Sequence, residues 1–68
     1  MEGILIDGSP QDGGGRIAAD GVVYWFSLAD APGVRTDWIG QRVSFEPHSP
    51  NSLTAIDVRL RNSTEGEL

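Results

Sequence analysis

The apolar positions along the chain have the spacing of β-strands rather than of helices. No segment keeps apolar residues at i, i+3, i+4 and i+7 over ten residues, as an amphipathic helix would. Residues 42–46 alternate instead, with Val43 and Phe45 on one face and polar residues on the other. Nine glycines and four prolines divide the chain into short segments. This pattern is typical of an all-β domain.

The pattern predicts five strands joined by turns. Asp20-Gly21 is a favoured dipeptide of the type I′ turn, so the segments on either side of it should form a hairpin. Strict alternation in the last strand would place Ile56, Val58 and Leu60 on one face. The predicted strands are residues 4–6, 16–19, 22–26, 42–46 and 56–61.

These strands predict one small domain over residues 1–61, followed by a polar C-terminal tail over residues 62–68. Five short antiparallel strands can close into a barrel, which leaves no exposed edge. The glycine run 13–15 is expected to be a flexible loop or a bulge. Trp38, in a long loop, is expected to cover one end of the barrel.

Composition limits the setting of the domain. The 68 residues include ten acidic side chains and five arginines, for a net charge of -5. This charge opposes approach to a phosphate backbone. The absence of cysteine excludes disulfides and thiolate metal sites and is usual in a reducing compartment. We expect a cytoplasmic monomer with no membrane association.

Four segments resemble the cold-shock domain, a member of the OB-fold family. Residues 40–46, Gly-Gln-Arg-Val-Ser-Phe-Glu, nearly match that family's Gly-Gln-basic-Val-Ser-Phe-Glu strand. Residues 13–17 and 22–27 lie where the family has its two RNA-binding motifs, and residues 55–58 resemble its closing Ala-x-Asn-Val. The order and spacing agree over residues 3–60. The resemblance implies a divergent cold-shock domain, a five-stranded antiparallel OB-type barrel.

The resemblance also implies binding of single-stranded RNA or DNA, through aromatic rings that stack on bases and nearby basic groups that meet phosphates. Trp25 takes the place of a histidine of the second motif, and Phe26 matches its second phenylalanine. Arg16 replaces an aromatic residue, and Arg35 matches a basic position in the following loop. The other stacking positions have lost their rings, and binding is expected to be weak. The positions without rings are Asp7, Gly8, Gly14, Val23 and Val34.

Two interpretations of Phe26 remain open at this point. Strict alternation puts it on the core side of its strand, together with Tyr24. The resemblance puts it on the binding side, because strands bend sharply in such barrels. Tyr24 and Phe45 are both predicted to lie in the core.

An alternative function is an acidic protein–protein interaction module on the same fold, which could imitate nucleic acid. The acidic surface would then meet a basic protein partner. Val23 and Val34, together with Trp25 and Phe26, would form an apolar patch for that partner.

No constellation of residues indicates an enzyme. The acidic residues are scattered over turns and outer strand faces, and His48, set between prolines in a loop, has no candidate nucleophile partner. We therefore expect no catalytic residues, no metal site and no cofactor.

Overall fold

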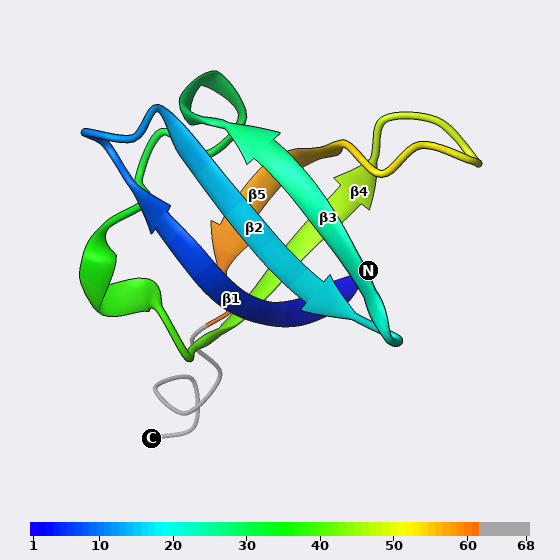
Figure 1. The fold of residues 1–68 in the computed structure, drawn as a ribbon, viewed down its shortest axis with the longest axis horizontal. Helices are drawn as coiled ribbons and strands as arrows, with labels where there is room; N and C mark the ends of the chain where they lie inside the picture. Colours follow the sequence, from blue (N-terminus) through cyan, green and yellow to red (C-terminus); the bar gives the residue numbers. More distant parts are fainter. Residues whose placement is uncertain (62–68) are drawn as a thin grey trace.

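The computed structural model describes residues 1–61 and is an all-β domain with two short 3₁₀ turns (Figure 1). The elements are β1 (Glu2–Ser9), β2 (Gly14–Ala19), β3 (Val22–Ser27), η1 (Leu28–Asp30), η2 (Thr36–Trp38), β4 (Arg42–Pro47) and β5 (Ala55–Leu60). The tail predicted for residues 62–68 lies outside the described residues. Within residues 1–61, no helix has the length and apolar character needed to cross a membrane.

The five strands form one antiparallel sheet in the order β3-β2-β1-β4-β5. The predicted all-β class and the five antiparallel strands are confirmed. The predicted closure into a barrel is not: β3 and β5 are the two edges of the sheet, and Trp25 of β3 forms only an isolated parallel bridge with Thr54, the residue before β5.

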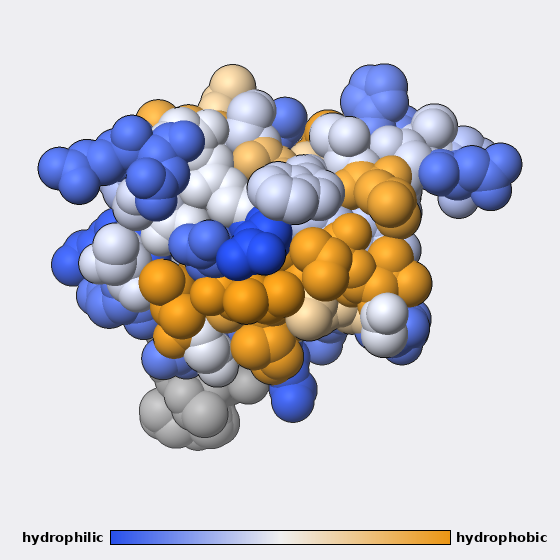
Figure 2. All heavy atoms as spheres, in the orientation of Figure 1, coloured by the Kyte–Doolittle hydropathy of each residue, from blue (hydrophilic) through white to orange (hydrophobic). Residues whose placement is uncertain are grey.

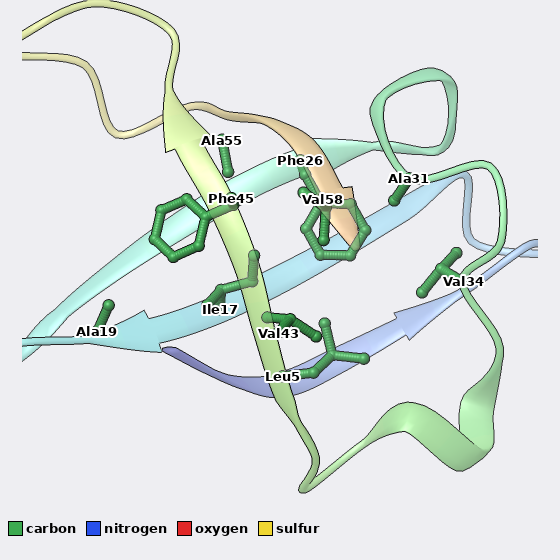
Figure 3. Close-up of a cluster of buried hydrophobic side chains, with 10 residues drawn as sticks. All are labelled: Leu5, Ile17, Ala19, Phe26, Ala31, Val34, Val43, Phe45, Ala55 and Val58. Atoms are coloured by element: carbon green, nitrogen blue, oxygen red, sulfur yellow. The ribbon is translucent and has the colours of Figure 1, made fainter. Parts of the chain in front are cut away.

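The sheet folds over itself, so that β1, β2 and β3 lie in front of β4 and β5 (Figure 1). Apolar side chains from both layers fill the space between them (Figure 3). The ring of Phe45 lies 4.9 Å from that of Tyr24, measured between centroids, which places both in or against the core as predicted. The buried residues are Leu5, Ile17, Ala19, Phe26, Ala31, Val34, Val43, Phe45, Ala55 and Val58.

The β2–β3 hairpin agrees with its sequence signal. Asp20 and Gly21 both have positive φ, at 54° and 77°, as a type I′ turn requires. The hairpin pairs without a register shift from the turn to Gly14 and Ser27. Residues opposite each other on β2 and β3 therefore point to the same face.

The prediction of strict alternation in β5 is wrong. Asp57 has φ of 55°, outside the strand region, and the pairing with β4 shifts at this point. The residues buried in β5 are consequently Ala55 and Val58, three positions apart, whereas Ile56 and Leu60 are half-buried. A single residue in the left-handed conformation thus changes which side chains reach the core.

The glycine run is a strand start rather than a free loop, because β2 begins at Gly14. A Cβ on Gly14 would collide with the backbone oxygen of Phe26, and one on Gly15 would collide with that of Asp7. These close approaches allow β2 to pack tightly between its neighbours. Trp38, in η2, is half-buried and packs against the core.

Candidate nucleic-acid interface

The outer face of β1, β2 and β3 carries two rows of side chains that run across the strands. In one row Asp7 pairs with Arg16, which pairs with Trp25. A register shift between Leu5 and Asp7 bulges β1 at Ile6 and brings Asp7 opposite Arg16. The bulge therefore places a carboxylate, a guanidinium and an indole side by side.

Trp25 is the most exposed large apolar side chain of residues 1–61, with 58% of its surface accessible. The guanidinium carbon of Arg16 lies 5.5 Å from the centroid of its ring, within the range of a cation–π contact. The same guanidinium donates from Nη2 to Oδ2 of Asp7 at 3.1 Å. Arg16 is thus held between a ring and a carboxylate, and the indole is held against a planar cation.

The backbone around Trp25 is fixed by the β4–β5 connection. The Trp25 N–H donates to the carbonyl oxygen of Leu53 at 2.8 Å, next to the bridge with Thr54. Leu53 is itself half exposed, at 53%. The indole is therefore flanked by the loop that joins β4 to β5.

A depression of about 240 Å³ opens beside Trp25, toward the loop between β1 and β2. Its floor and walls combine an aromatic edge, glycine backbone and charged side chains. The lining residues are Asp7, Asp12, Gly13, Gly14, Gly15, Arg16, Trp25 and Phe26.

The β1–β2 loop that walls the depression is ordered by hydrogen bonds. The Oγ of Ser9 donates to Oδ2 of Asp12 at 2.9 Å and accepts the Asp12 N–H at 3.1 Å. Ser9 is buried, and these two bonds satisfy its hydroxyl. The carbonyl of Gly13 accepts from the N–H of Leu28 at 2.7 Å, which ties the loop to the end of β3.

Phe26, which the resemblance placed on the binding side, and Val34, predicted to belong to an apolar surface patch, lie in the core instead. For Phe26 the interpretation from strict alternation is therefore the correct one. Phe26 has 6% and Val34 has 1% of its surface exposed. Both lie against Gly8, where a Cβ would be 3.2 Å from Cζ of Phe26 and 3.4 Å from Cγ2 of Val34. The absent side chain at Gly8 makes room for these two, so neither is available as a stacking surface or as part of an apolar patch.

Arg35 is not part of the Trp25 site. It forms an ion pair with Asp37 at 3.3 Å, and both side chains are mostly exposed. It lines a different depression, together with Asp37, Trp38, Gln41 and Leu60. Of the four predicted nucleic-acid-binding residues, the structure brings together Arg16 and Trp25, with the buried Phe26 beneath the same depression.

The second row of the outer face is aliphatic. Ile4 pairs with Ala18, which pairs with Val23. Ile4, Val23 and the bulged Ile6 are each about two-fifths exposed, and an apolar band crosses this face (Figure 2). Val23 is thus on the surface as predicted. The two isoleucines were missed as surface residues, although the alternation in residues 4–6 puts them opposite the buried Leu5.

Asp7 and Asp12 were also missed as site residues. Asp7 stands where the resembled family has a ring, and neither residue is aromatic or basic. Among residues 1–61, no three His, Asp or Glu side chains are gathered as a metal site would require. Comparison with known protein families, curated proteins and solved structures finds no match to this chain.

Proposed function

We propose that this domain is an OB-type module of the cold-shock kind that binds single-stranded RNA or DNA weakly at Trp25. The observation that carries the proposal is an exposed indole on the β2–β3 face, between the β1–β2 and β4–β5 loops. OB folds bind oligonucleotides on their strand 2–3 face, between the corresponding two loops.

The strand arrangement supports the OB assignment. The OB fold is a five-stranded, partly open Greek-key barrel. Here β1 pairs with both β2 and β4, and Trp25 of the edge strand β3 forms a parallel bridge with Thr54, which precedes the other edge strand, β5. This arrangement is consistent with the partly open form of such a barrel.

The affinity should be low because a single ring is available. Stacking of one base contributes about 1–3 kcal/mol, whereas a dissociation constant of 1 mM requires about 4.1 kcal/mol. One further contact, from Arg16 to a phosphate or a second base, brings the sum to that range. We therefore expect dissociation constants of about 1 mM at low salt.

Charge restricts the ligand further. Arg16 is tied to Asp7, and Arg35 to Asp37, so each basic group has a carboxylate that competes with phosphate. The net charge of -5 adds a general repulsion. Binding should therefore rely on stacking more than on phosphate contacts, and salt should weaken it only mildly.

Fluorescence of the full chain tests the proposal. A Trp38→Phe variant leaves Trp25 as the single indole, and it is titrated with a pyrimidine-rich heptamer at low salt. Saturable quenching near millimolar strand supports the site, since stacking changes the emission of the ring. An unchanged emission up to several millimolar strand contradicts it.

A second candidate function is supported by the aliphatic row Ile4–Ala18–Val23 beside Trp25. Three aliphatic side chains and an indole suit a protein partner, and the acidic net charge favours a basic one. Val23→Lys discriminates between the two candidates. It should abolish docking of a basic partner through that row, and it should leave strand binding at Trp25 unchanged or slightly stronger.

A further inference from the structure

The depression beside Trp25 has an acidic wall that phosphate binding does not explain. Asp7 from β1 and Asp12 from the β1–β2 loop both line it. A carboxylate repels phosphate, so these groups work against the backbone of a strand. They are compatible with the part of a nucleotide that carries no charge, which is the base.

The carboxylate of Asp12 is held in position by hydrogen bonds, and its oxygens can still accept hydrogen bonds from a ligand. Ser9 fixes it with a bond to Oδ2 and a bond to its backbone N–H. None of the ion pairs formed within residues 1–61 involves Asp12. An ionised carboxylate offers about four lone-pair sites and no donor. Asp12 therefore presents a positioned carboxylate in the depression that the exposed indole of Trp25 also lines.

We propose that Asp12 makes this site selective for a base with an exocyclic amino group, with guanine preferred. The inference rests on the proposed function, since it concerns a base stacked on Trp25. Such a base would direct its hydrogen-bonding edge into the depression that Trp25 and Asp12 both line.

The donor pattern of the bases decides the order of preference. Guanine carries a ring N–H next to its amino group, and these two donors match the two oxygens of one carboxylate. Cytosine donates through its amino group, a known pairing with Asp or Glu. Adenine also has an amino group, but its neighbouring ring nitrogen is an acceptor. Thymine and uracil flank one N–H with two carbonyl oxygens, which a carboxylate repels.

The effect should be measurable despite low affinity. Good two-point contacts between a side chain and a base discriminate by about 1–3 kcal/mol, and 1.4 kcal/mol is tenfold. For a site open to water we expect the lower part of this range, a preference of about tenfold for guanine over thymine.

The test uses four DNA heptamers with three thymines on each side of a central G, C, A or T, titrated into the full chain at low salt. Because any of the seven bases can stack on the single ring, a tenfold preference for guanine should make the central-G strand bind about twofold more tightly than the all-thymine strand. Asp12→Asn should reduce that ratio to near one. Asp20→Asn is the matched control: it removes the same charge at the β2–β3 turn and should leave the ratio unchanged.

The possible outcomes separate the base preference due to Asp12 from single-strand binding at Trp25. Equal binding of all four strands overturns the base preference and leaves single-strand binding intact. A guanine preference that persists in Asp12→Asn also overturns it, because the preference then comes from another group. Failure of every strand to bind overturns the proposed function, and the inference with it.

Discussion

The guanidinium of Arg16 lies over the indole of Trp25 while it is also bonded to the carboxylate of Asp7. The three residues come from three adjacent strands in register, and the bulge at Ile6 makes the register possible. In this row the cation orients the ring, and the carboxylate orients the cation. The exposed indole of Trp25 is thus preorganised for stacking by its contacts with Arg16 and, through it, Asp7.

Trp25→Ala should abolish strand binding while changing the stability little. The ring is 58% exposed, and surface substitutions usually change the free energy of unfolding by no more than about 0.5 kcal/mol. Trp25→Phe keeps a smaller ring and should retain part of the affinity. Chemical denaturation and strand titration of both variants check the two halves of this prediction, and strong binding by Trp25→Ala would contradict it.

Asp7→Asn should strengthen strand binding and increase its salt dependence. The change frees Arg16 from its carboxylate partner and makes the net charge less negative by one. The slope of log affinity against log salt should steepen by about 0.7, the value for one phosphate contact of a single strand. Asp37→Asn frees Arg35 at the other depression and serves as the control, with a smaller effect on the slope.

Phe26→Ala should destabilise the domain severely. The side chain is 6% exposed and lies against Gly8 and Val34, and truncating a buried phenylalanine costs about 3–5 kcal/mol. Phe26→Leu removes less volume and should be tolerated better. Urea denaturation of both Phe26 variants and of Trp25→Ala tests whether Phe26 stabilises the core while the adjacent Trp25 does not. A fully stable Phe26→Ala would place Phe26 on the surface.

Asp57→Val should destabilise the domain, whereas Asp57→Gly should not. Asp57 has φ of 55°, where the left-handed conformation costs an L-residue roughly 1–2 kcal/mol and a β-branched one more. Arg59→Val is the control, since Arg59 is also exposed in β5 and its loss breaks the same ion pair with Asp57, but Arg59 is not among the residues of positive φ. Thermal unfolding of the three variants provides the measurement. An equal loss of stability in Asp57→Val and Arg59→Val would contradict the explanation by backbone strain.

Much of the fold follows from local signals in the sequence. Alternation identified residues 42–46 as a strand with Val43 and Phe45 inward, and Asp20-Gly21 predicted the hairpin turn. Both signals depend on a few neighbouring residues. By contrast, the left-handed Asp57 and the bulge at Ile6 result from long-range pairing. No local pattern marked these two positions, so the inward set of β5 and the position of Asp7 were not predictable.

The candidate site was predictable only in part, for the same reason. The outward direction of Trp25 followed from its alternation with Tyr24. Strict alternation also indicated the inward direction of Phe26, which the resemblance had placed on the binding side. The burial of Val34 depends on Gly8, a residue far away in the sequence whose missing side chain leaves space for it. The acidic wall at Asp12 depends on how the β1–β2 loop folds back beside β3.

The most direct test of the central claim maps backbone amide shifts of the labelled full chain during titration with a pyrimidine-rich single strand, at low and then moderate salt. The account predicts shifts confined to the face around Arg16, Trp25 and the Gly13–Gly15 segment, smaller at higher salt and absent in Trp25→Ala. Absence of shifts at millimolar strand, or shifts centred on Arg35 and Trp38, would contradict a single-strand site at Trp25.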